Sequence, residues 1–145
     1  MASKKNKAKN DPASIRKRGT RDAVGEKERR ITFSLSKQIK GEGQTIDEWN
    51  ELGLHAKLLN RIKFVGQHSV HIVRQNQFIK EYHKVEFPPN SGFSEPKHIT
   101  EEVTWAVMHI TTNSKEVVVG YIDEDDVFQI IFLDKDHQFW PVKKR

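Results

Sequence analysis

The strongest constraint on this chain is that its positive charge is concentrated at one end. Residues 1–30 contain eleven Lys and Arg against four acidic residues, a net charge of +7, whereas the whole 145-residue chain carries only +5. Residues 31–145 are therefore slightly acidic, at −2. Residues 1–30 also contain no aromatic residue, so they cannot bury enough apolar surface to offset the entropy of ordering. We expect a disordered basic arm, residues 1–30, followed by a single domain, residues 31–145.

The basic arm predicts contact with a polyanion. A cationic segment without aromatic side chains can bind the phosphates of RNA or DNA but has nothing on which bases could stack. An alternative interpretation is a solubilising tail with no specific partner. The predicted nucleic-acid-binding residues are basic residues of the arm: Lys4, Lys5, Lys7, Lys9, Arg16, Lys17, Arg18, Arg21, Arg29 and Arg30.

Composition excludes several classes of protein. The chain has no cysteine, which excludes disulfides, thiolate nucleophiles and cysteine-based zinc sites. No segment approaches the roughly 18 apolar residues that span a bilayer, and the N-terminus lacks the apolar region of a secretory signal. We expect a cytoplasmic protein with no membrane partner and no cofactor.

The first half of the domain has the pattern of one strand followed by helices. Residues 31–35 alternate apolar and polar, as in a half-buried strand. Thr45 and Glu48 have the spacing of a capping box, and apolar residues then recur at helical spacing to Val65, with Gly53 as a weak point. A second helix is predicted to about Gln77, followed by a short extended segment.

The second half predicts a long loop and three strands. Consecutive prolines, Pro88 and Pro89, exclude regular structure in a loop that continues to about residue 100. Strands are predicted over 103–110, 116–122 and 127–133, and the last is apolar enough to be central in the sheet. The predicted fold is α+β, with an antiparallel sheet of about four strands in the order β-α-α-β-β-β and helices on one face.

No strong catalytic motif is present, so the candidate site depends on residue types. His137 follows the central strand and is predicted at the rim of a groove as a proton-transfer group. Lys97 and His98, on the long loop, could hold a phosphate beside it, as metal-free RNA cleavage requires. His109 is interpreted as a partly buried sheet residue. An alternative is a metal-dependent site formed by Asp134, Asp136, His109 and His137.

One family resemblance emerges from the last strands. Residues 118–123, an acidic turn, residues 127–131 and then residues 136–140 are similar to the strand–turn–strand unit of the RelE/ParE superfamily of small bacterial toxins, which in many members ends in a histidine followed by an aromatic residue. The resemblance implies a metal-independent endoribonuclease, or a gyrase-poisoning relative, neutralised by an antitoxin. His137 matches the terminal histidine and Tyr121 an aromatic group. The predicted catalytic residues are His137, His98, Lys97 and Tyr121.

A non-enzymatic function is the competing hypothesis. In it the domain is an accessory module of a defence or toxin–antitoxin system and binds another protein through exposed Trp140, Phe93 and Phe87, while the arm tethers the complex to nucleic acid.

Overall fold

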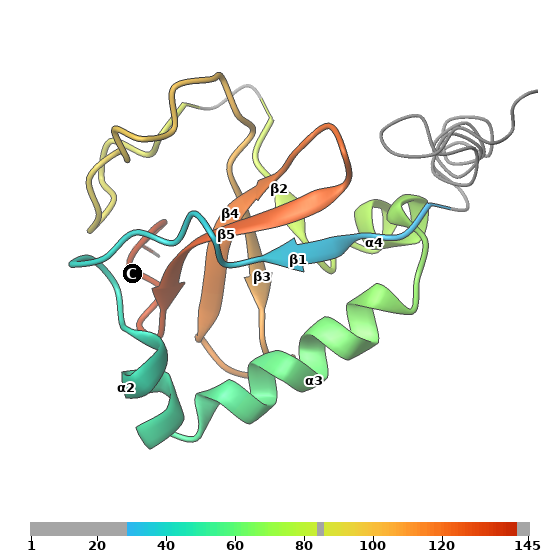
Figure 1. The fold of residues 1–145 in the computed structure, drawn as a ribbon, viewed down its shortest axis with the longest axis horizontal. Coiled ribbons are helices and arrows are strands. Elements are labelled where there is room, and N and C mark those ends of the chain that lie inside the picture. Colours follow the sequence, from blue (N-terminus) through green and yellow to red (C-terminus); the bar gives the residue numbers. More distant parts are fainter. Residues whose placement is uncertain (1–28, 84–85, 142–145) are drawn as a thin grey trace, which may run out of the picture.

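The computed structural model describes residues 29–83 and 86–141 and confirms an α+β fold (Figure 1). Most of the predicted nucleic-acid-binding residues, from Lys4 to Arg21, lie outside the described residues. The elements, in chain order, are β1 (Thr32–Ser34), α2 (Ile46–Glu51), α3 (Leu54–Gly66), α4 (Val70–Gln75), β2 (Lys80–Glu81), β3 (Ala106–His109), β4 (Val117–Ile122) and β5 (Val127–Asp134).

Within the described residues the sheet has five strands in the order β1-β5-β4-β3-β2, so the expectation of about four was one short. The predicted extended segment after the helices supplies the extra strand, β2, at one edge. The sheet is also mixed, because β1 pairs with β5 in parallel while the other pairs are antiparallel. The alternation of residues 31–35 predicts a strand but says nothing about the direction of its partner. As predicted, β5 is central and almost wholly buried.

The helices begin and end where local chemistry predicts. The Thr45 hydroxyl accepts the Glu48 backbone N–H at 3.0 Å, and the Glu48 carboxylate accepts the Thr45 N–H at 2.8 Å, which confirms the capping box. Gly53 adopts a φ of +75°, a conformation that favours glycine, and separates α2 from α3. Among the helices of the described residues, none has the length and apolar character needed to cross a membrane.

Two apolar clusters occupy the two faces of the sheet. The first lies between the helices and the sheet and includes Trp49, Leu58 and Val65. The second is covered by side chains from the irregular loop of residues 86–105 and from the segment after β5. In Figure 1 this loop lies on the side of the strands away from α2 and α3. Phe93 stacks on Phe132 at 4.5 Å between ring centres, and Phe87 contacts Phe139 at 5.3 Å. The expectation that these two loop phenylalanines are exposed binding residues was therefore wrong, because they pack in the second cluster.

A β-bulge in β5 determines which of its residues join each of the two apolar clusters. Val119 pairs with Phe132 but Gly120 pairs with Ile130, so Ile131 is an extra residue in β5. Ile131 and Phe132 consequently both join the second cluster, while Ile130 and Leu133 belong to the first. At the bulge the two backbones approach so closely that only glycine fits at position 120.

Candidate functional site: a basic groove at the edge of the sheet

The described residues form a groove of about 460 Å³ beside the edge strand β2. Its lining combines positive and aromatic side chains from α3, β2, β3 and the segment after β5, and no carboxylate is among the residues that the structure describes there. We call it the basic groove. Its lining residues are Arg61, Gln77, Phe78, Lys80, Tyr82, Val107, His109, Thr112, His137 and Trp140.

Two permanent cations of the groove rest on aromatic rings. The Lys80 Nζ lies 5.5 Å from the centre of the Tyr82 ring, and the Arg61 guanidinium lies 5.0 Å from Phe64 and 5.4 Å from Phe78. Burial lowers the pKa of Arg61, but an arginine stays charged at neutral pH. Within residues 29–83 and 86–141, the Arg61 Nε–H has no hydrogen-bond acceptor. Among the same residues, no ion pair joins Lys80 or Arg61 to a carboxylate, so both cations retain capacity to bind an anion.

A stacked pair of aromatic rings forms part of the wall. Tyr82 and Trp140 lie 4.7 Å apart and are parallel to within 4°. Both residues are only partly buried, so part of the pair is open to solvent. Burial raises the pKa of Tyr82, which keeps its phenol neutral at physiological pH. A flat apolar surface beside cations suits a nucleic-acid base and its phosphate.

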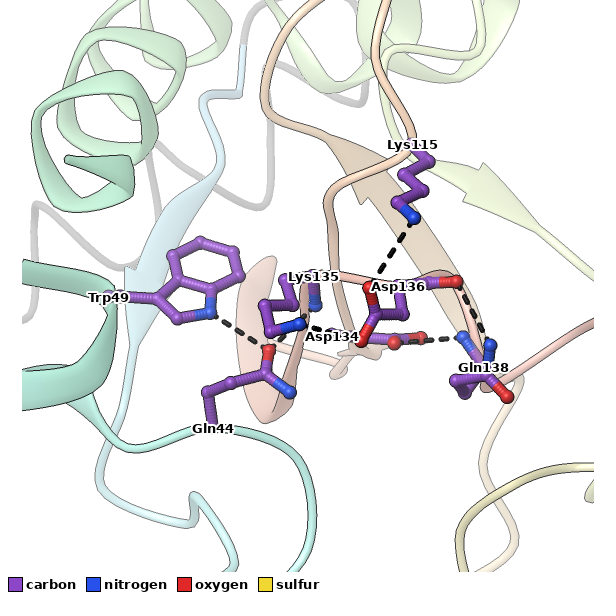
Figure 2. A network of polar contacts seen from close by, with 7 residues as sticks. All are labelled: Gln44, Trp49, Lys115, Asp134, Lys135, Asp136 and Gln138. Carbon is purple, nitrogen blue, oxygen red and sulfur yellow. Dashed lines mark hydrogen bonds and ion pairs between the residues drawn. The ribbon is translucent and has the colours of Figure 1, made fainter. Parts of the chain in front are cut away.

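Asp134, at the end of β5, holds the segment that carries His137 and Trp140. Its two carboxylate oxygens accept the backbone N–H groups of Gln138 and Phe139, each at 2.8 Å, and the chain reverses through His137 at a φ of +58°. Phe139 is then fully buried in the second cluster. Figure 2 shows Asp134 at the centre of this turn, next to Gln44, whose side-chain oxygen accepts the Lys135 backbone N–H at 2.7 Å.

These contacts assign Asp134 a structural role. Its burial raises the pKa of its carboxyl, and the two backbone N–H donors oppose that shift. The neighbouring Asp136 is instead half-exposed and paired with Lys135 and Lys115, whose contacts lower its pKa. Among the described residues, no group of three or more His, Asp or Glu side chains could hold a metal ion. The structure gives no support to the metal-dependent alternative.

We predict that Asp134→Asn destabilises the protein by about 1–3 kcal/mol. The amide keeps one acceptor oxygen but turns an NH₂ group towards the second backbone N–H, which is then buried without a partner. Asp136→Asn, two residues along, removes only surface ion pairs and should cost less than about 1 kcal/mol. Urea unfolding of both variants measures the difference, and equal losses would contradict this role of Asp134.

Two imidazoles lie side by side in the lining of the groove. His109, expected to be partly buried, is exposed at the end of β3, and its ring centre lies 5.5 Å from that of His137. The Nδ1 of His109 is 3.2 Å from the Ser114 carbonyl oxygen, and the Nδ1 of His137 is 3.1 Å from the Trp140 carbonyl oxygen. Because a carbonyl oxygen only accepts, each Nδ1 carries the proton and each Nε2 is left for other chemistry.

The other predicted catalytic residues lie elsewhere. The His98 Nε2 is 2.9 Å from the carbonyl oxygen of Lys37, whose Nζ donates to the Tyr121 hydroxyl at 3.4 Å. Tyr121 and His109 are at opposite ends of the sheet. His109 pairs with Val117, and Tyr121 lies four residues further along β4, which corresponds to about 13 Å of strand. Neither Lys97, His98 nor Tyr121 lines the basic groove.

The surroundings of Tyr121 also do not suit phosphate chemistry. The Tyr121 hydroxyl donates to Glu101 at 3.5 Å, and burial raises the pKa of this phenol. Glu101 lines a second groove of about 790 Å³, together with Glu86, Glu95 and Glu102, and no Lys or Arg is among the described residues that line it. A phosphate would be repelled there. The structure therefore does not assemble the predicted set of His137, His98, Lys97 and Tyr121, and keeps only His137 in the basic groove.

The last two residues of the predicted arm belong to the folded domain. The Arg29 Nε forms a 2.7 Å ion pair with Asp126, and the Arg29 carbonyl oxygen accepts the Val70 N–H at 2.7 Å. Arg30 forms a β-bridge with Ser69. Arg29 is thus paired within the protein, which argues against its prediction as a phosphate-binding residue.

Sequence reasoning missed Arg61, Lys80 and Tyr82. A signal existed in the spacing of Lys80 and Tyr82, because residues two apart in a strand share a face. The pairing of Lys80 with Val107 then brings β3, and with it His109, to the same side. Arg61 gave no such signal, since its position on α3 relative to β2 depends on how the helix packs.

No protein-family model, curated protein or solved structure matches the chain. The similarity to the RelE/ParE superfamily thus stays a prediction from the sequence.

Proposed function

We propose that this protein binds single-stranded nucleic acid in the basic groove, with the basic arm adding contacts to phosphates. The observation that carries the proposal is the combination, in one groove, of two cations and the Tyr82–Trp140 stack, with no carboxylate among the described residues that line it. Cations contact the backbone while aromatic rings stack on bases, and this pairing is typical of proteins that bind single strands.

The contrast between the two grooves supports the same proposal. The domain is slightly acidic as a whole, and four glutamates line the groove beside Tyr121, whereas the described residues that line the basic groove include Arg61 and Lys80 and no carboxylate. A polyanion is thereby favoured in the basic groove over the acidic one. A duplex would not expose its bases to Trp140, so we expect single strands to bind more tightly than duplex.

A pair of matched charge reversals tests the groove. Lys80→Glu places a carboxylate in the groove, and we expect it to weaken binding of a fluorescent single-stranded oligonucleotide by about tenfold or more, as a charge-assisted contact is replaced by repulsion. Lys97→Glu makes the same change in net charge at an exposed lysine outside the groove and should weaken binding about twofold at most. Fluorescence anisotropy at fixed salt gives both dissociation constants.

The outcome separates a site from a general charge effect. Equal weakening by the two reversals would show that net charge alone drives binding and would contradict the proposed groove.

Quenching of Trp140 fluorescence on binding, absent in Trp140→Phe, provides a second test. Trp49 and Trp105 are buried in the two clusters and should contribute little quenching. Failure of the wild-type protein to bind any single strand would overturn the proposal.

A further inference from the structure

Two imidazoles and two cations line the same groove, and this set suggests more than binding. The His109 and His137 rings are 5.5 Å apart, and Lys80 and Arg61 line the groove with them. Binding alone does not require a pair of histidines whose Nδ1 atoms are both fixed by backbone carbonyls. Fixing Nδ1 in this way orients an imidazole and leaves Nε2 able to accept or donate a proton.

We infer that His109 and His137 are a general acid–base pair that cleaves single-stranded RNA without a metal ion. The inference rests on the proposed binding of single strands in the basic groove and names RNA as the substrate, because the reaction needs a 2′-hydroxyl. One neutral imidazole removes the proton from the 2′-hydroxyl while the other, protonated, faces the 5′-oxygen of the next nucleotide.

The reaction is a transesterification whose atoms balance without a further reactant. The 2′-oxygen forms a bond to phosphorus, the bond from phosphorus to the 5′-oxygen breaks, and the protonated imidazole gives its proton to that leaving oxygen. The products are a 2′,3′-cyclic phosphate and a 5′-hydroxyl. Each turnover exchanges the protonation states of the two histidines, which solvent then restores.

The groove can also stabilise the charge that develops in this reaction. The pentavalent phosphorus carries extra negative charge on its non-bridging oxygens, and a positioned cation lowers the energy of that state. Lys80 and Arg61 are the cations of the groove, and within the described residues no ion pair joins either of them to a carboxylate. Attacking and leaving oxygens lie on opposite sides of phosphorus, so two separate rings are needed rather than one.

Histidine variants of the full chain test the inference. His109→Gln and His137→Asn should each lower the rate of cleavage of a labelled single-stranded RNA by about 10²–10⁴-fold. Asparagine is chosen at position 137 because it tolerates the positive φ of the turn. His98→Gln, at an exposed histidine outside the groove, is the matched control and should leave the rate unchanged. Excess EDTA should have no effect on the wild-type protein.

Binding is measured in parallel on the all-deoxy analogue of the same oligonucleotide, which cannot be cleaved by this route. The histidine variants should bind it within about threefold of the wild-type protein, since loss of acid–base catalysis does not require loss of binding. The wild-type rate should pass through a maximum with pH, because one imidazole must be neutral and the other protonated, and His137→Asn should remove one limb of that profile.

The results distinguish the two proposals. RNA that binds but stays intact would overturn the inference and leave the proposed function standing, whereas absence of binding to both oligonucleotides would overturn both. Cleavage that survives His109→Gln and His137→Asn, or that EDTA abolishes, would also overturn the inference. Recovery of a 2′,3′-cyclic phosphate end that both variants lose would support it.

Discussion

Replacing Gly120 with alanine should abolish the native fold or destabilise it by about 4 kcal/mol or more. A Cβ at this position would lie 1.8 Å from the Gln129 carbonyl oxygen and 2.8 Å from the Gln129 carbonyl carbon. Both are backbone atoms of β5, which is buried on both faces between β1 and β4 and cannot move aside without disturbing both clusters. Thermal and urea unfolding of the purified variant, followed by circular dichroism, measures the loss.

Gly66→Ala is the matched control for this substitution. Gly66 ends α3, and the nearest atom to its added Cβ would be the Ile31 carbonyl oxygen at 4.0 Å. Alanine is the better helix former, so we expect a change within about 1 kcal/mol, in the stabilising direction. A Gly120→Ala variant as stable as Gly66→Ala would show that the bulge in β5 is not built as described.

Neutralising the basic arm should produce the second large effect. Replacing all nine Lys and Arg of residues 1–28 with glutamine should reduce the salt dependence of single-strand binding, because each lost phosphate contact removes about 0.7 from the slope of log affinity against log salt. If all nine side chains contact phosphates, the magnitude of this slope decreases by about 6. The folded domain keeps its sequence, so the basic groove should still bind, with a lower affinity at low salt.

Titrations of a single-stranded oligonucleotide at several salt concentrations measure this effect. The Lys80→Glu variant is the informative comparison, because it changes the groove and leaves the arm intact. We expect the arm variant to change the salt slope most and Lys80→Glu to change the discrimination between single strand and duplex most. An unchanged slope after all nine substitutions would support the alternative of a solubilising tail.

Much of the fold was predictable because its signals are local. The capping box at Thr45 and Glu48, the joint at Gly53 and the continuous apolar run of β5 depend on neighbours in the sequence. The parallel pairing of β1 with β5 was not predictable, because it depends on a contact between residues almost a hundred positions apart, such as Thr32 with Val127. The bulge at Gly120 likewise depends on two strands at once.

The candidate site was predicted only in part. His137 was found because it follows a central strand directly, a position where side chains often line a groove. The partners predicted for it, Lys97 and His98, were wrong. The groove does contain a lysine and a second histidine, but these two residues lie outside it. His109 was placed with His137 only in the metal-dependent alternative and was otherwise interpreted as a partly buried sheet residue, whereas it is exposed at the end of β3.

The sequence by itself determined the charge division between the arm and the domain, the α+β class and the order of most elements, because composition and periodicity act over a few residues. Only the tertiary structure decided which cations and imidazoles meet. The basic groove draws on α3, β2, β3 and the segment after β5. Those elements come together through strand pairing, the packing of α3 and the Asp134 turn. Such contacts join residues far apart in the chain and cannot be recognised from the local sequence.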